Sequence, residues 1–198
     1  MSNIKSALEI ALEKSKKIER LSSQEMAEIK QQEKIDAILA QYYKDQIESD
    51  DLWHRLKGIS SKYLLKAQNN FLQSLTFQSN DYDIKKRRTG ILAIENLKES
   101  NQSSDIEYYL QQLIKIKDEF IKNKEQLREN LQKELARDPQ KRLQTFQQGN
   151  QIIVKQLSLE EALDQNQQLK QHMQQTEKQF KKQFNFAKEK LSDILNKG

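Results

Sequence analysis

The chain has 198 residues, of which 35% are hydrophobic and 32% are charged, and its formal net charge is +5 at pH 7. Cysteine is absent, which excludes disulfides and thiolate metal sites, and no apolar run approaches the roughly 20 residues of a membrane span. Basic and acidic residues are interspersed, which argues against a strong electrostatic surface for nucleic acid or anionic lipid. The residues after Lys5 are amphipathic, unlike a secretory signal, so we expect a cytoplasmic protein.

Residues that break helices are scarce, since the chain contains one Pro and four Gly. Leu, Lys, Glu and Gln, which are good helix formers, are abundant. The modest hydrophobic content fits elongated helices that each bury one narrow stripe. We therefore predict an all-α fold, an elongated helical bundle of coiled-coil-like hairpins, in three regions that comprise residues 1–58, 59–100 and 101–198.

The first region, residues 1–58, is predicted to form a helical hairpin. A first helix is expected over residues 4–20, and Ser22 and Glu25 then have the spacing of a capping box for a second helix. The second helix continues to about Lys44. Its apolar residues recur every three or four positions and are expected to be buried: Met26, Ile29, Ile38, Leu39 and Tyr42.

Trp53, the single Trp of the chain, lies in a short predicted helix that Lys57-Gly58 stops. It either plugs a junction between longer helices or is an exposed anchor for a protein partner. His54 stands four residues after Asp50, but two ligands make a weak metal site, and a surface or capping role is favoured. Phosphate-binding, nucleophile-elbow and dinucleotide motifs are absent, so we expect neither an enzyme nor a cofactor.

The second region, residues 59–100, predicts two helices, one over 59–78 and one from Asp81 or Asp83 to about Leu97. It holds the densest positive charge of the chain, which we name the basic cluster: Lys85, Lys86, Arg87 and Arg88. Four cations could contact phosphates, with the nearby aromatic residues Phe77 and Tyr82 available for stacking. Only two of four consecutive residues share a helix face, however, and a solvated helix surface is the favoured interpretation.

The third region begins with Ser104 and Glu107, whose spacing predicts a capping box and a helix of about 32 residues that Asp138-Pro139 ends. A connector, residues 137–158, follows. It contains the turn signal Gly149-Asn150 and the β-branched run of residues 152–154. These features predict a short β-hairpin over 143–157, and an irregular or helical connector is the alternative.

Ser158 and Glu161 predict a further capping box, and residues 159–196 contain neither Gly nor Pro, so one uninterrupted final helix is predicted. Its apolar period is closer to 3.6 than to 3.5 residues, which disfavours a long regular coiled coil. The stripe includes Phe180, Phe184 and Leu191. We expect it to pack against the helix of residues 105–136 or against a partner.

The segment Ile4-Lys5-Ser6-Ala7-Leu8-Glu9-Ile10-Ala11-Leu12-Glu13-Lys14 resembles the start of a group of uncharacterised bacterial helical proteins. The likeness covers roughly the first 58 residues, with a fainter likeness over 151–162. The resemblance implies a bacterial cytoplasmic helical protein without an established activity, and it carries over no functional residue.

These observations predict a non-enzymatic protein that presents helix faces to a protein partner or to a second copy of itself. Apolar stripes need such packing, because isolated helices are marginal in water. The candidate partner-binding residues are Trp53, Phe180, Phe184 and Leu191. The alternative is a nucleic-acid-associated helical protein that uses the basic cluster.

Overall fold

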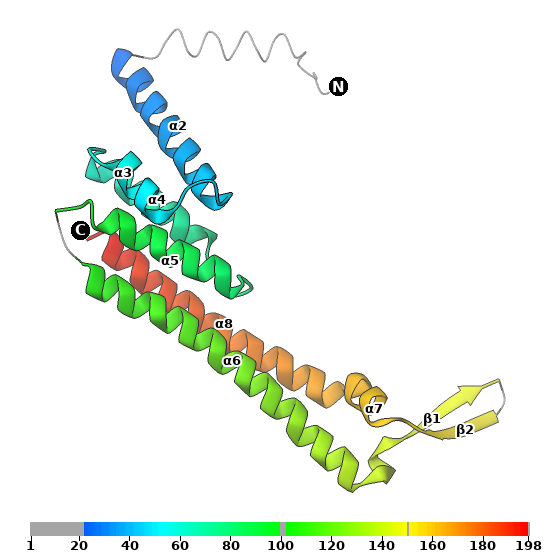
Figure 1. Ribbon diagram of the computed structural model, residues 1–198. Helices are drawn as coiled ribbons and strands as arrows, with labels where there is room; N and C mark the ends of the chain where they lie inside the picture. The colour runs from blue at the N-terminus through cyan, green and yellow to red at the C-terminus, as the bar shows by residue number, and fades with distance from the viewer. Residues whose placement is uncertain (1–21, 100–101, 150, 198) are drawn as a thin grey trace, which may run out of the picture.

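The computed structural model describes residues 22–99, 102–149 and 151–197, and the helix predicted over residues 4–20 lies outside these ranges (Figure 1). In the described part the fold is all-α apart from one antiparallel pair of strands, as the sequence predicts. The elements in chain order are α2 (Ser23–Tyr43), α3 (Ser49–Leu56), α4 (Ser61–Ser74), α5 (Asp81–Glu95), α6 (Ser103–Arg137), the 3-10 helix η1 (Pro139–Arg142), β1 (Leu143–Gln148), β2 (Gln151–Gln156), α7 (Leu159–Gln165) and α8 (Gln167–Leu195). Within these ranges no helix is sufficiently long and apolar to cross a membrane.

Two long helices form an arm that extends from a head (Figure 1). The arm consists of α6 and α8, which pack side by side and run in opposite directions. With 35 residues, α6 spans about 50 Å. The head consists of α2 to α5 with the adjoining ends of α6 and α8, and η1, the two strands and α7 lie at the far end of the arm.

One apolar core fills the head and draws on all three regions of the sequence. Ile35 of α2, Phe71 of α4 and Leu113 of α6 are each no more than 1% exposed. Gly90 lies where α5 meets α4, and a Cβ at this position would stand 2.9 Å from Cζ of Phe71. The absence of a side chain at Gly90 therefore allows the close approach of two helices.

Only the second half of α2 joins this core. Ile38, Leu39 and Tyr42 are buried as predicted, but Ile29 is 43% exposed. The prediction for Ile29 is wrong because the first half of α2 extends past α3, α4 and α5 (Figure 1). Helical spacing shows which residues share a face, whereas burial requires a neighbour along the full length of the helix.

Two of the three predicted capping boxes are confirmed. The Oγ atom of Ser22 accepts a hydrogen bond from the backbone N–H of Glu25 at 3.2 Å, and the Glu25 carboxylate accepts one from the Ser22 N–H at 2.7 Å. Ser158 and Glu161 form the same pair of bonds at 3.2 and 2.8 Å. Each box satisfies N–H groups that have no partner inside the helix and thereby sets where α2 and α7 begin.

The third predicted box, at Ser104 and Glu107, is not formed. The α6 helix begins at Ser103, and its N-cap Gln102 makes no side-chain capping bond. The Glu107 carboxylate instead accepts hydrogen bonds from Arg88 of α5. The Glu107 carboxylate therefore holds a bidentate, charge-assisted contact with another helix in place of the local cap.

The final helix is interrupted at Asn166, which corrects the prediction of one continuous helix over 159–196. Asn166 has extended backbone (ψ 109°), and its side-chain oxygen accepts a hydrogen bond from the N–H of Leu169 at 2.8 Å. Asn is a favoured N-cap residue, so the break needs neither Gly nor Pro. It separates α7 from α8 and lets α7 contribute to a small core at the end of the arm, which comprises Leu135, Leu157, Ala162 and Leu163.

The connector contains a β-hairpin, which confirms the strand alternative for residues 143–157. β1 and β2 pair antiparallel with Leu143 opposite Gln156 and Gln148 opposite Gln151. Gly149 has φ 62°, a left-handed conformation that Gly adopts without steric cost. In the part of the chain that the structure describes, these two strands form a sheet by themselves.

Candidate interaction surfaces

Three of the four residues in the basic cluster make ion pairs within the chain. Lys86 pairs with Asp45, Arg87 with Asp83 and Arg88 with Glu107. The side chains of Lys86 and Arg87 are only 9% and 15% exposed. The prediction of a solvated surface is therefore wrong for these two, and Arg88, at 36%, is shared between helices. Lys85 is exposed.

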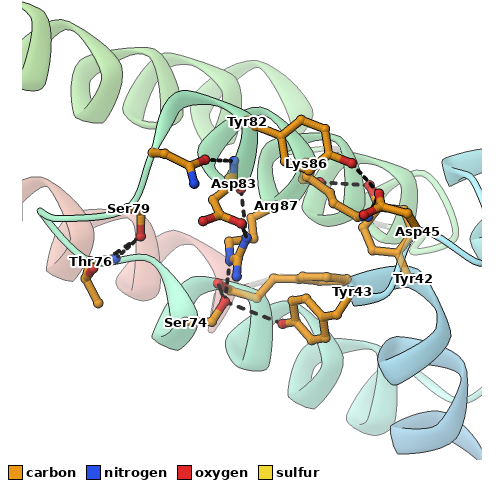
Figure 2. A network of polar contacts seen from close by, with 12 residues as sticks. Tyr42, Tyr43, Asp45, Ser74, Thr76, Ser79, Tyr82, Asp83, Lys86 and Arg87 are labelled. Atoms are coloured by element: carbon orange, nitrogen blue, oxygen red, sulfur yellow. Dashed lines mark hydrogen bonds and ion pairs between the residues drawn. The ribbon is translucent and has the colours of Figure 1, made fainter.

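Lys86 belongs to a network at the end of α2 (Figure 2). Its ammonium group and the Tyr82 hydroxyl both donate to the Asp45 carboxylate, and it also lies over the Tyr42 ring at 5.2 Å. Asp45 has a left-handed backbone (φ 57°), which turns the chain directly after α2. The hydrogen bond from Lys86, followed by that from Tyr82, lowers the pKa of Asp45.

Tyr42 connects this network to the core. Its hydroxyl donates to the backbone carbonyl of Lys86 at 2.8 Å, and its ring meets Phe71 edge-on at 5.4 Å. Burial, supported by negative charge at Glu48 and Asp45, raises the pKa of Tyr42 to about 12. The hydroxyl therefore stays protonated and acts as a structural donor.

Arg87 connects three helices (Figure 2). It donates to the Asp83 carboxylate at 2.8 Å, donates to the Ser74 hydroxyl at 2.8 Å and lies over the Tyr43 ring at 5.3 Å. A guanidinium that is bonded and stacked in this way is a packing element. Its charge is already matched by a neighbouring carboxylate.

Arg88 joins the head to the arm through Glu107 of α6. The hydrogen bonds from Arg88 are the main cause that lowers the pKa of Glu107, and a bond from Gln111 contributes. The same contact raises the pKa of Arg88. The basic cluster therefore holds helices together and leaves little unpaired charge for a phosphate.

A second polar network lies within the head. Glu95 is 1% exposed and accepts hydrogen bonds from Gln68 at 2.8 Å and from the N–H of Gln102 at 3.2 Å. Lys98, whose side chain is 2% exposed, stands 3.2 Å from the same carboxylate. A buried charge requires such partners, so the network is a structural feature of the junction between α5 and α6.

Trp53 is half-buried on α3. Its ring contacts the His54 ring edge-on at 4.9 Å, and the Lys57 ammonium lies over it at 5.2 Å. Both neighbours come from the same turn, so the indole keeps an accessible surface. Its role as a partner anchor stays a prediction.

The apolar stripe of α8 packs against other parts of the same chain. Phe184 and Leu191 are fully buried, and Phe184 meets Phe77 at 5.8 Å. Phe180 is half-buried and contacts Phe120 of α6 at 5.7 Å. The stripe was predicted to pack either against the helix of residues 105–136 or against a partner, and the structure shows the first of these. Phe184 and Leu191 are not a surface for a partner, because their own core already covers them.

Among residues 22–99, 102–149 and 151–197, no three or more His, Cys, Asp or Glu side chains are grouped so that they could hold a metal ion. His54 and His172 are both exposed. The i,i+4 pair of Asp50 and His54 thus has no third ligand in the described structure.

The hairpin carries an apolar surface that the sequence prediction did not identify as a site. Its exposed side chains are Leu143 (49%), Phe146 (41%), Ile152 (74%), Ile153 (41%) and Val154 (60%). Residues opposite one another share a face, so Phe146 lies beside Ile153 and Thr145 beside Val154. The β-branched run was the signal for this surface, but its exposure depends on the absence of a covering layer.

A groove of about 640 Å³ lies between the two arm helices near the head. Tyr108 and Phe186, which are 57% and 61% exposed, form part of its lining together with Lys115 and Lys182. This groove is a second accessible aromatic surface that the apolar stripes did not predict, because its residues flank the buried stripe.

Comparison with known protein families gives a match over residues 50–193. The chain belongs to a family of unknown function (DUF6657). No curated protein and no solved structure matches it. The expectation of an uncharacterised family is confirmed. The matched residues overlap the N-terminal segment of the predicted resemblance only over 50–58, and they include the segment of fainter resemblance, residues 151–162.

The part of the chain that matches DUF6657 extends from α3 through nearly all of α8. It therefore includes the basic cluster, the arm and the hairpin. Asp45 and Tyr42, which anchor α2 to the basic cluster, precede it. The residues that match the family thus include every surface described above, and α2, which precedes them, packs against them.

Proposed function

We propose that this member of DUF6657 is a non-enzymatic protein-interaction or scaffolding protein, in which the head and arm present the hairpin to a protein partner. The observation that carries the proposal is the exposure of five apolar side chains on a two-stranded sheet at the far end of the arm. Apolar patches that are concentrated on one element favour association, because their burial removes apolar area from water.

The hairpin has a further reason to bind. Two-stranded hairpins are marginally stable alone in water and gain stability when further strands or a packed surface cover them. Over residues 143–156 the hairpin carries one charged side chain, Lys155, and it contains no Pro. Charges and prolines are the features that normally block strand edges.

The base of the hairpin is held firmly, which supports a presenting role. The N–H of Leu157 donates to the carbonyl of Arg142 at 2.8 Å, and the Arg142 guanidinium donates to the Leu157 carbonyl at 3.2 Å. Lys155 lies 3.8 Å from Glu161 of α7. These contacts and the small core fix the hairpin to the arm, so binding would not have to order a loose loop.

The alternative function, association with nucleic acid through the basic cluster, has weaker support. Lys86, Arg87 and Arg88 would have to leave carboxylate partners before they neutralised phosphates. The expected cytoplasmic location and bacterial origin remain part of the proposal.

Site-directed photo-crosslinking in cells that naturally express the chain tests the proposed function. A photo-reactive amino acid at Ile152, which is 74% exposed, is expected to capture a protein partner. The same amino acid at Asn70, an exposed position on α4, is the matched control and is expected to capture none. Failure to form an adduct at Ile152, or equal adducts at both positions, would refute the proposal.

A further inference from the structure

The outer edge of β2 offers free backbone groups. The N–H of Leu157 bonds to the carbonyl of Arg142, so these two residues form a hydrogen-bonded pair of the ladder. Hydrogen-bonded and non-hydrogen-bonded pairs alternate along antiparallel strands. The N–H and C=O groups of Ile152, Val154 and Gln156 therefore point away from β1, and within the described ranges no third strand pairs with them.

This edge is complementary to itself. If two β2 strands pair antiparallel about a two-fold axis at Ile153, Ile152 of one copy lies opposite Val154 of the other on one face. On the opposite face, Phe146 and Ile153 of one copy continue into the same two residues of the second, because Phe146 is already the cross-strand neighbour of Ile153. Apolar and aromatic cross-strand pairs are the stabilising units of a sheet.

The charges permit this arrangement. In the same register Lys155 stands opposite Gln151 of the other copy, so no two like charges face one another. The edge of β1 is less suitable, because its outward residues include Thr145 and Gln147 in place of the β-branched apolar pair. A strongly charged peptide would find only one charged side chain, Lys155, on β2.

We propose that the partner of the hairpin is a second copy of this chain, joined through the β2 edges into a four-stranded antiparallel sheet with Ile153 at the two-fold axis. This inference rests on the proposed function, since it names the occupant of the same surface. The symmetry reverses the direction of the second hairpin, so the two arms leave the sheet toward opposite ends and the heads do not collide.

The small area of the β2–β2 contact leads us to expect a weak dimer. One strand edge buries less than the roughly 800 Å² per partner of a standard interface. We therefore expect a reversible dimer with a dissociation constant in the micromolar range, which forms as the protein concentration rises.

Sedimentation velocity over a concentration series tests the pairing with two matched variants. Val154→Lys introduces a charge on the β2 edge, and Thr145→Lys introduces the same charge on the β1 edge within the same cross-strand pair. Two-fold symmetry makes each substitution act twice, so Val154→Lys is expected to raise the dimer dissociation constant at least about tenfold. Thr145→Lys is expected to change it by less than about threefold, and equal effects would refute edge pairing.

A disulfide tests the register, because the natural chain has no cysteine. Ile153 would form a non-hydrogen-bonded pair with its own copy, with Cα atoms about 4.5 Å apart, which a disulfide can bridge. Mild oxidation of Ile153→Cys is expected to give a covalent dimer in high yield. Thr145→Cys, under the same conditions, is expected to give little, and equal yields would refute the register.

The two proposals fail in different ways. A wild-type chain that stays monomeric at all concentrations would overturn self-pairing, as would assemblies that keep growing beyond the dimer. If the Ile152 crosslinker still captured a different protein in cells, the proposed presenting function would stand without self-pairing.

Discussion

Three phenylalanines of α8 differ in exposure and allow a graded test of the core. Phe184 is fully buried, Phe180 is half-buried and Phe186 is 61% exposed. Truncation of a buried Phe to Ala costs about 3–5 kcal/mol of the free energy of unfolding, because apolar contacts are lost and a cavity remains. We expect that loss for Phe184→Ala, about 1–2 kcal/mol for Phe180→Ala, and a change within about 0.5 kcal/mol for Phe186→Ala.

Chemical denaturation followed by circular dichroism and by the fluorescence of Trp53 measures these differences. In a chain of this size each kcal/mol lowers the melting temperature by roughly 2–4 °C, so Phe184→Ala should lower it by roughly 6–20 °C. The two probes should give the same midpoint, since the Phe184 core includes head residues such as Phe77. A loss below about 1 kcal/mol for Phe184→Ala, or an equal loss for Phe186→Ala, would refute the packing argument.

Three further predictions concern the junctions between helices. Gly90→Ala should lower the free energy of unfolding by up to about 2 kcal/mol, because overpacking against the buried Phe71 ring outweighs the gain of about 1 kcal/mol in helix propensity; a higher melting temperature would contradict this. Arg87→Ala should lower the free energy of unfolding by about 1–3 kcal/mol in a denaturant titration, because Arg87 is hydrogen-bonded and part-buried. Lys85→Ala, at an exposed position, should lower it by less than about 0.5 kcal/mol. Equal losses would contradict the assigned roles. The pKa of Glu107 is lowered from its ordinary value of 4.5 in the folded chain, so its contribution to stability is present above pH 4.5 and is lost as the pH falls through the folded pKa. The stability difference between wild type and Glu107→Gln should therefore shrink below pH 4.5 in denaturation measured across pH, and a difference that grows on acidification would show the opposite linkage.

The basic cluster shows why its role could not be predicted from its own residues. Four consecutive cations on a helix have the same appearance in sequence whether solvent or carboxylates surround them. Asp45, which pairs with Lys86, is 41 residues away, and Glu107, which pairs with Arg88, is 19 residues away. Only the packing of α2 and α6 against α5 brought these groups together.

The capping motifs also show which features depend on local sequence and which depend on tertiary contacts. The boxes at Ser22 and Ser158 involve residues three positions apart, and in both the glutamate keeps its bond to the backbone of the cap serine. Glu107 had the same spacing from Ser104, but Arg88 lay within reach in the folded chain. Asn166 shows the reverse case, because an interior Asn became a cap when α7 could bury Leu163 in the small core.

The sequence alone determined the all-α class, the positions of most helices, the apolar stripe of α8 and the turn signal of the connector, whereas it left the choice between strands and an irregular or helical connector open. These depend on intrinsic propensities, on the 3.6-residue period and on bonds between residues three or four apart, all of which are local. The tertiary structure decided which apolar residues are covered and which cations are paired. Phe184 is buried, whereas Ile152 is 74% exposed, although both are large apolar residues within regular elements. Burial and charge pairing depend on neighbours distant in the chain, and the fold supplies such neighbours to the head and leaves the hairpin without them.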